Sequence, residues 1–483
     1  MASSSTPARP DGWPRITKSS PVRDLGPGNM DYERCAALHN DLLTRAVKGR
    51  GVEMPSSPLT WWEVTAPSEE IVDTLHPSLI EFLKRACDVG VLPPWSVLFL
   101  YVGALKSPEG LRDRMDLYED EDEYGRFIKL YESSHFRGMD DEGILFDQRT
   151  LKASFIEDYN DTPIITGHEW SWLPLEVILD SYLQMIDKEK VQTISEDQAK
   201  LVRDDPSCHV VDQWIIHHYT NTDLERAIAA FKRLVEVIES RIPPRNDSNL
   251  IRLPWHDPAT FANQDILPPV SFAYKFLKAI SNCDVQFKYI APGVRFPTVA
   301  EFQDQHIKDF LTSPYNHHGQ YPGDCPLRIL QIDNADQQPI AYDKGFGLHN
   351  MTPGFYISPV MQRWSQFWTN GCRLLLPYGI GRAGWARHSN GEPFGVTDYL
   401  EEDITMLRET LRDAHGDLYQ NGITNGITNS HFVQIDKVLN NWADRVESGD
   451  WEVDENGVAG GIDKFREADT ESHWEKYWIP PSW

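Results

Sequence analysis

The stretch from Trp95 to Val102 is a short apolar run rich in β-favouring residues and closed by Gly103. A run this short and this apolar predicts a strand buried on both faces, as in a parallel sheet. Further strand-like runs occur at 285–291, 326–332 and 372–378. A chain with several such strands needs helices between them.

Helical patterns do alternate with these runs. Residues 31–48, 68–89 and 174–190 suit helices, and the last begins near Pro174, a residue that suits a first helical turn. Thr222 and Glu225 form a capping box, followed by apolar residues at helical spacing as far as Pro243. Further helices are expected at 270–281, 299–312, 400–415 and 431–447. The pattern predicts an α/β fold with a mixed sheet of buried strands flanked by helices and a helical C-terminal part. A Rossmann-like arrangement is one option.

The domain organisation follows from composition along the 483 residues. Residues 1–28 are rich in Ser, Pro and Gly without periodicity, which predicts a flexible tail. Residues 29–483 are expected to form one large catalytic domain, with a subdivision near 243–255 as the alternative.

The charge balance narrows the classes of partner. The formal net charge of -27 repels polyanions at long range, so a general nucleic-acid or anionic-membrane binder is excluded. There is no apolar run of membrane-spanning length and no secretory signal pattern at the N-terminus. The six cysteines are far apart without a CxxC pair, which is typical of a reducing compartment and predicts a cytoplasmic protein.

The chain contains partial matches to a metal motif and to a dinucleotide-binding motif. His39 and Asp41, and likewise His415 and Asp417, match half of a ferrous HxD triad, but residues two apart on a helix point away from each other. Residues 379–384 spell GxGxxG after an apolar run, yet the following residues lead into another turn instead of the required helix. We therefore expect neither a metal nor a cofactor.

Charge is distributed unevenly. Residues 344–391 contain five basic residues, many aromatics and no acid. Arginines hold phosphates and aromatic rings stack on bases, so this stretch is a candidate local anion site, for example for the end of a tRNA. The candidate side chains are Arg363, Arg373, Arg382 and Arg387. The alternative is that the aromatics are core and the arginines pair with acids elsewhere. The acid-rich run 113–123 is either a solvated segment or a cation-attracting rim.

Two places carry candidate nucleophiles. Ser107 follows the expected 95–102 strand, where ligands sit in open α/β sheets, and Lys106 beside it could ease ionisation of the hydroxyl. Ser134 and His135 place a hydroxyl beside an imidazole, although a catalytic triad is a spatial arrangement and not a sequential one. The simpler interpretation of Ser107 is a turn serine.

Acids and aromatics also gather at the head of the 174–190 helix. Glu176 and Asp180 are four apart on one face, so they could grip a guanidinium in fork geometry with a Trp stacked above it. Glu169 and Trp170 precede them, and Tyr182 follows. The alternative is an acidic first turn that complements the helix dipole.

Three segments carry a resemblance to a known family. They are 169–179, which begins Glu-Trp-Ser-Trp, then 290–298 (Ile-Ala-Pro-Gly-Val-Arg-Phe-Pro-Thr), and the tail motifs at 457–463, 468–477 and 480–483. The chain resembles the arginine-containing cyclodipeptide synthases of fungal secondary-metabolite gene clusters. The resemblance implies that arginine from arginyl-tRNA is joined to a second aminoacyl-tRNA and closed into a diketopiperazine, without ATP or metal. The partners implied are therefore two aminoacyl-tRNAs, bound by local contacts.

The resemblance also implies roles for single residues. Bacterial cyclodipeptide synthases hold the first aminoacyl group on a serine of a Rossmann-like core, and Ser107 best matches that serine, although their serine motif is missing here. Tyr182 would relay protons, and Glu169, Glu176 and Asp180 would recognise the guanidinium. Two rival functions stay open: a tailoring oxidoreductase with Trp-rich segments lining a pocket for a small aromatic metabolite, and a non-catalytic binding or scaffold protein.

Overall fold

A computed structural model of the chain divides into two compact units, Met1–Ile216 with Trp483, and His217–Ser482. The division lies upstream of the 243–255 stretch considered from the sequence. The structure describes the residues 12–26, 28–88, 98–112, 125–133, 143–156, 164, 171–203, 205, 207–211, 213–244, 250–262, 267–303, 327–333, 352–357, 368–394, 416–420 and 433–482.

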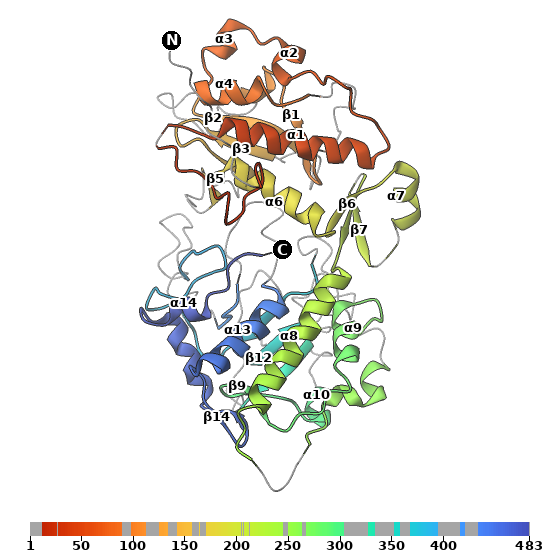
Figure 1. Ribbon diagram of the computed structural model, residues 1–483, viewed down its shortest axis with the longest axis vertical. Helices are drawn as coiled ribbons and strands as arrows, with labels where there is room; N and C mark the ends of the chain where they lie inside the picture. Colours follow the sequence, from red (N-terminus) through yellow and green to blue (C-terminus); the bar gives the residue numbers. More distant parts are fainter. Residues whose placement is uncertain are drawn as a thin grey trace, which may run out of the picture. The chain divides into compact units, whose positions relative to one another are not determined.

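The first unit is built on a five-stranded antiparallel sheet in the order β1-β2-β3-β4-β5 (Figure 1). Its strands are β1 (Val102–Leu105), β2 (Phe127–Ser133), β3 (Gly143–Asp147), β4 (Lys152–Ile156) and β5 (Leu173–Pro174). Residues 95–97 of the strand predicted at 95–102 lie outside the described residues, and for 98–102 the prediction of a strand in a parallel sheet is wrong. The chain turns back at Phe99–Val102, where Leu100 has a φ of 37°, so β1 begins only at Val102 and pairs antiparallel with β2.

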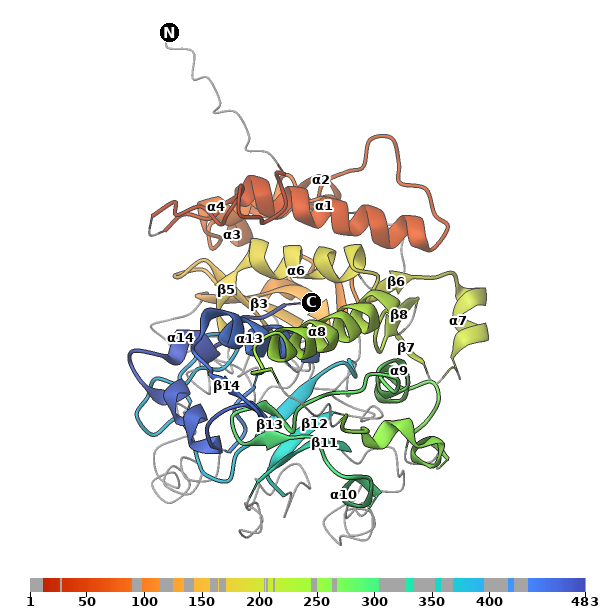
Figure 2. The same cartoon turned by 60° about the horizontal axis from the view of Figure 1, so that its bottom comes forward.

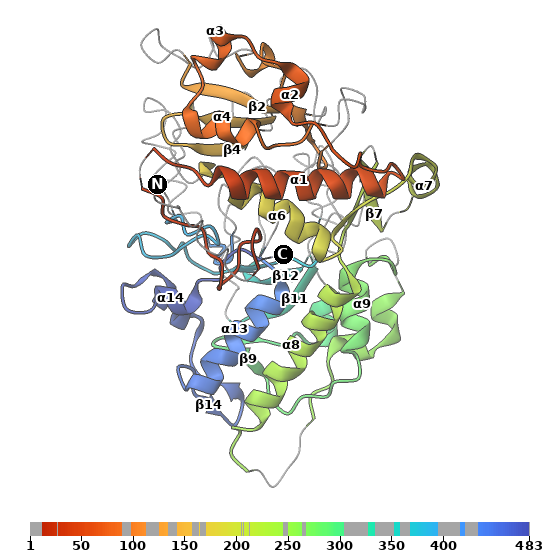
Figure 3. The same ribbon diagram turned by 45° about the horizontal axis from the view of Figure 1, so that its top comes forward.

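Helices α1 (Tyr32–Gly49) and α6 (Leu175–Asp187) pack against each other in the first unit (Figure 3). Both confirm the sequence prediction. The helix predicted at 68–89 is instead two short ones, α3 (Glu69–Val72) and α4 (Pro77–Leu83). Pro77 separates them because it lacks the N–H that a continuing helix needs, and it stands at the start of α4.

The remaining elements of the first unit are short. They are α2 (Trp61–Thr65), the 3-10 helix η1 (Gly110–Arg112), α7 (Glu196–Val202) and a three-stranded sheet in the order β6-β8-β7. The strands of that sheet are β6 (Val191–Thr193), β7 (Cys208–Val211) and β8 (Trp214–His217), the last of which ends at the division between the units.

The second unit contains a seven-stranded mixed sheet in the order β13-β12-β11-β10-β9-β15-β14. Its strands are β9 (Tyr289–Ala291), β10 (Val294–Arg295), β11 (Leu327–Ile332), β12 (Gly354–Ile357), β13 (Cys372–Leu375), β14 (Val453–Asp454) and β15 (Gly457–Val458). The pair β15–β9 is parallel, and the other strand pairs of this sheet in the described residues are antiparallel. The α/β class predicted from the sequence is confirmed.

Two long helices, α8 (Asn221–Glu239) and α13 (Ile435–Ser448), pack side by side over one face of this sheet (Figures 1 and 2). The N-cap of α8 is Thr220 with Asp223 as its capping-box partner, two residues before the predicted Thr222 box. Thr220 is favoured because its hydroxyl accepts a hydrogen bond from the Asp223 N–H at 3.1 Å, and that N–H has no carbonyl partner within the helix.

The smaller helices of the second unit agree with the sequence in part. Helix α9 (Phe272–Ala279) confirms the prediction at 270–281. Helix α10 (Val299–Gln303) agrees with the start of the helix predicted at 299–312, and residues 304–312 lie outside the described residues, as does the helix predicted at 400–415. Between α8 and α9 lie the 3-10 helices η6 (Pro254–His256) and η7 (Pro258–Phe261). After α13 and the strands β14 and β15, the 3-10 helix η10 (Ile462–Asp469) and the helix α14 (Trp474–Tyr477) follow. No helix in the described ranges is long and apolar enough to cross a membrane.

Candidate functional site

Ser107 lies in the exposed turn between β1 and η1. Its Oγ accepts a hydrogen bond from the Gly110 N–H at 3.2 Å, which is the contact of a capping serine. The Lys106 ammonium lies 3.1 Å from the Glu132 carboxylate, so its charge is partly neutralised there. The Ser107 side chain is exposed, and the lysine that the sequence suggested as its activator is paired with Glu132. Ser134 and His135 lie outside the described residues.

Tyr182 is a core residue of the first unit and is 2% exposed. Its ring stacks on Phe99 with centroids 4.3 Å apart, and Trp214 packs edge-on against the same Phe99. Burial raises the pKa of the Tyr182 hydroxyl, which keeps it protonated. In this position Tyr182 stabilises the core and does not present a proton relay to a substrate.

The two acids predicted to grip one guanidinium have different partners. Glu176 is 4% exposed, and its Oε2 accepts from the Cys35 thiol at 3.5 Å. Asp180 is 1% exposed and does bind a guanidinium, that of Arg15 from the N-terminal segment. Burial raises the pKa of the Glu176 carboxyl. The fork expected from this pair is therefore absent, and the cation partner belongs to Asp180. Glu169 and Trp170 lie outside the described residues.

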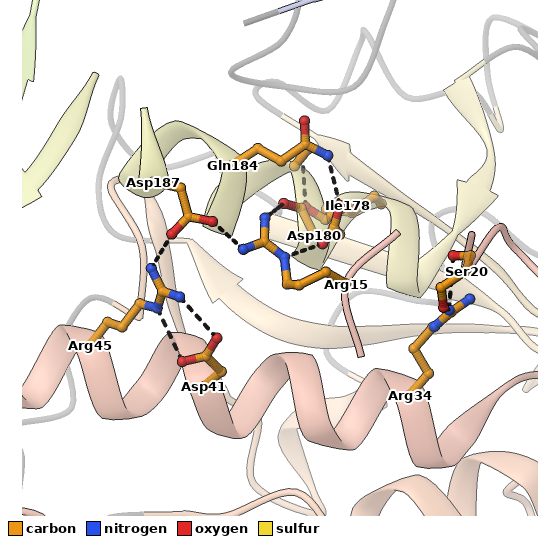
Figure 4. A network of polar contacts seen from close by, with 10 residues as sticks. Arg15, Ser20, Arg34, Asp41, Arg45, Ile178, Asp180, Gln184 and Asp187 are labelled. Carbon is orange, nitrogen blue, oxygen red and sulfur yellow. Dashed lines mark hydrogen bonds and ion pairs between the residues drawn. The ribbon is translucent and has the colours of Figure 1, made fainter. Parts of the chain in front are cut away.

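Arg15 is the centre of an ion-pair network shown in Figure 4. Its Nε donates to Asp180 Oδ1 at 2.5 Å, its Nη1 donates to Asp187 Oδ2, and its Nη2 donates to the Asp180 backbone oxygen at 3.5 Å. Gln184 Nε2 donates to the other Asp180 oxygen at 2.6 Å. All three nitrogens of one planar guanidinium thus meet acceptors of α6.

The network continues onto α1. Asp187 Oδ1 accepts from Arg45 Nη1 at 2.5 Å, and Arg45 binds Asp41 in bidentate fashion at 3.0 and 3.2 Å. Burial opposes the charge of Arg15, but its hydrogen bonds to the two aspartates outweigh that effect and raise the pKa of the guanidinium. The sequence places these acceptors by helical spacing, since Asp180, Gln184 and Asp187 recur every three to four residues of α6.

A second buried polar group lies between α1 and the sheet. His39 Nδ1 is 2.9 Å from the Tyr131 hydroxyl, and its Nε2 is 2.9 Å from the Cys87 carbonyl oxygen. A carbonyl only accepts, so we assign the proton to Nε2, and Nδ1 then accepts from Tyr131. Asp41, the other half of that HxD motif, pairs with Arg45 and is not turned to His39 for metal binding. The described residues contain no group of three or more His, Cys, Asp or Glu able to hold a metal.

The arginines proposed for an anion have internal contacts in the second unit. Arg373 Nε lies 3.8 Å from Asp417 Oδ2, and Arg387 donates to the Gly384 oxygen at 2.6 Å while lying over the Trp474 ring. Arg382 has an exposed side chain. Arg363 lies outside the described residues, as does the acid-rich run 113–123. Among the aromatics of this stretch, Phe355 and Trp368 are buried, which agrees with packing.

The GxGxxG segment forms a loop that binds a carboxylate of the same chain. The N–H groups of Gly381 and Ala383 donate to Asp469 Oδ2 at 3.0 and 2.8 Å. The N–H groups of Trp385 and Ala386 donate to Asp469 Oδ1 at 2.9 and 3.0 Å. Residues 379–394 contain no helix, as the sequence indicated, so the loop is a backbone nest for Asp469.

Two of the segments that carry the family resemblance meet in the second unit. Gly293 has a φ of 68°, and a Cβ placed on it would lie 2.4 Å from the Ile462 nitrogen. Gly457 pairs with Tyr289 across the parallel β15–β9 contact. Arg295 of the same segment binds Glu301 and Asp333. These contacts give Gly293, Arg295 and Gly457 a structural role.

Sequence reasoning missed Arg15, Cys35 and Asp469 as members of polar sites. Local patterns offered no signal for them, because each partner lies far away in the sequence. Comparison with protein-family models, with curated proteins and with solved structures found no match to this chain.

Proposed function

We propose that this chain is a cyclodipeptide synthase that joins arginine, delivered as arginyl-tRNA, to a second aminoacyl group. The observation that carries the proposal is the guanidinium held on α6. Asp180 and Asp187 engage Nε and Nη1 of Arg15, and the Asp180 backbone oxygen engages Nη2. Such a surface suits the side chain of arginine better than that of lysine, whose ammonium is a compact point charge.

Ser107 is the proposed acyl acceptor, supported by its exposed hydroxyl at the end of β1. The hydroxyl attacks the ester carbonyl of arginyl-tRNA, and the tRNA hydroxyl leaves with the proton. The α-amine of the second aminoacyl-tRNA then attacks the arginyl-serine ester, which forms the peptide bond and frees Ser107. Finally the α-amine of arginine attacks the second ester, closes the ring and releases the second tRNA. No oxidant or nucleotide is consumed.

The proposed tRNA contact is local, because the chain carries a net charge of -27. Arg382 contributes an exposed cation from the loop that holds Asp469. The proposal places the protein in the cytoplasm, where aminoacyl-tRNAs are available.

The decisive experiment incubates the purified protein with a tRNA pool, synthetases, ATP and the amino acids, followed by mass spectrometry for arginine-containing diketopiperazines. Product that disappears on ribonuclease treatment supports the proposal. Product formation that withstands ribonuclease, or no product with active synthetases, contradicts it. A visible spectrum of the protein that shows a bound chromophore would favour the oxidoreductase alternative.

A matched pair of serine variants tests the acyl acceptor. Ser107→Ala should abolish product while the protein stays folded, because the lost contact is one exposed cap worth about 1 kcal/mol. Ser195→Ala removes a comparable cap, that of α7, and should leave product formation intact. Equal activity in both variants removes Ser107 from the mechanism.

A further inference from the structure

The N-terminal segment (residues 12–26) contacts the acids of α6 through the Arg15 side chain. The network joins two arginines, Arg15 and Arg45, to three aspartates, Asp41, Asp180 and Asp187. Its formal charge is therefore -1 with Arg15 in place, and -2 when Arg15 leaves. The carboxylates of this network therefore favour a bound cation, and in the folded chain that cation is Arg15.

The segment is anchored by other residues. Arg34 of α1 donates to the Pro21 oxygen at 2.8 Å, to the Ser20 oxygen at 3.0 Å and to the Ser20 hydroxyl. Arg23 binds Asp31 through two nitrogens at 2.7 and 2.5 Å. Residues 20–23 thus hold the segment to the start of α1. Arg15 can leave its site without releasing the segment.

The two aspartates around Arg15 differ in exposure. The Arg15 side chain is 22% exposed and that of Asp187 is 41% exposed, so solvent reaches this end of the network. Asp180 is 1% exposed, and a buried carboxylate without a cation is costly. Departure of Arg15 therefore leaves a half-open site with a strong requirement for another planar cation.

We propose that the surface formed by Asp180, Gln184 and Asp187 is a guanidinium-binding site that Arg15 occupies as an internal competitor of the substrate. The identity of that substrate as arginyl-tRNA rests on the proposed function. A tethered side chain acts at an effective concentration in the millimolar range, so it lowers the apparent affinity for a free ligand. The N-terminal segment then sets the threshold at which an arginine side chain gains the site.

Binding can be tested without any assay of activity. Thermal unfolding of Arg15→Ala is followed with increasing agmatine, a small guanidine, and with putrescine, a diamine of similar length. Agmatine should raise the melting temperature of Arg15→Ala by about 3 °C or more at millimolar concentration, and putrescine should not. The wild-type protein should respond less, because its site is filled.

Three further variants separate the site from general charge effects. Lys18→Ala removes one exposed positive charge from the same segment but leaves Arg15 and the contacts of residues 20–23 in place, so it should respond to agmatine as the wild type does. The double variant Arg15→Ala, Asp180→Asn should lose the response. If Arg15→Ala does not fold, Arg15→Lys keeps the charge without the planar fork and should still gain stability from agmatine. Agmatine and putrescine acting alike, or a response that survives Asp180→Asn, overturns the proposal.

Measurement of KM for arginyl-tRNA distinguishes a failure of the internal competitor from a failure of the proposed function. With arginyl-tRNA as substrate, Arg15→Ala should lower KM about tenfold. If agmatine binds but neither the wild type nor Arg15→Ala makes cyclic dipeptide, the guanidinium-binding site is supported and the proposed function is contradicted. A different outcome is possible: the wild type makes cyclic dipeptide, but Arg15→Ala shows neither a response to agmatine nor a change of KM. That outcome would contradict the internal competitor and support the proposed function.

Discussion

His39 and Tyr131 share a buried hydrogen bond of 2.9 Å in which the imidazole accepts from the phenol. Burial lowers the pKa of His39 to about 4, so the ring is neutral in the folded protein. In the unfolded chain the same ring has a pKa of about 6.5. Because the folded state resists protonation, this residue contributes stability above pH 6.5 that is lost as the pH falls toward 4.

The pH dependence gives the first prediction. Between pH 7.5 and pH 5, His39 should cost the wild type about 2 kcal/mol of unfolding free energy. His39→Gln can still donate to the Cys87 oxygen but does not titrate. Urea unfolding at both pH values should show the stability difference between wild type and variant shrinking by that amount on acidification. A difference that does not change with pH contradicts a neutral His39.

The carboxylate of Asp469 gives the second prediction. Four backbone N–H groups lose a charged acceptor in Asp469→Asn, so the free energy of unfolding should fall by about 2–3 kcal/mol. Asp463→Asn on the same 3-10 helix removes only a largely exposed ion pair with Arg466. It should change the free energy of unfolding by less than about 0.5 kcal/mol. Urea titration of both variants measures the contrast, and equal losses would contradict the role of the nest.

The close approach at Gly293 gives the third prediction. Gly293→Ala adds a methyl group 2.4 Å from the Ile462 nitrogen at a positive φ, so we expect a loss of about 3 kcal/mol or more. Gly449→Ala has a φ of 79° but no atom within 4 Å of the new Cβ, and should cost only about 1–2 kcal/mol. The urea midpoints of the two variants separate steric clash from backbone strain. Similar midpoints would show that the backbone at Ile462 shifts away from the new methyl group at little cost in free energy.

Arg295 gives the fourth prediction. It binds Glu301 through two nitrogens at 2.9 and 2.5 Å and Asp333 through Nε at 2.6 Å. Arg295→Lys keeps the charge but loses the fork, so the unfolding free energy should drop by about 1–2 kcal/mol. Arg466→Lys serves as the control: it loses a mostly exposed pair with Asp463 and the stacking of the guanidinium over the Tyr378 ring, and should cost less than about 1 kcal/mol. If Arg295→Lys leaves the unfolding free energy unchanged, the positive charge alone, without the planar fork, is enough to bind Glu301 and Asp333.

Periodic segments were predictable from sequence because their burial pattern is local. The spacing of apolar residues identified α8 and α13, although the capping box predicted at Thr222 and Glu225 is formed by Thr220 and Asp223 instead. The apolar run at 95–102 misled, because a turn at Leu100 overrides β propensity there. Glu176 and Asp180 were recognised as polar members of α6, but their partners were not. Arg15 lies 165 positions from Asp180 and Asp469 lies 88 from Gly381, and no local pattern encodes such contacts.

The parallel contact between β15 and β9 has a consequence for biosynthesis. Gly457 pairs with Tyr289, and the nest for Asp469 is likewise completed by residues late in the chain. At a ribosome speed of about 5–20 residues per second, β9 waits roughly 10–30 s for its neighbour to emerge. Its edge is open during that time, while every strand of the five-stranded sheet has already been translated. The open edge of β9 in the nascent second unit is therefore the part of the growing chain that most needs protection by a chaperone.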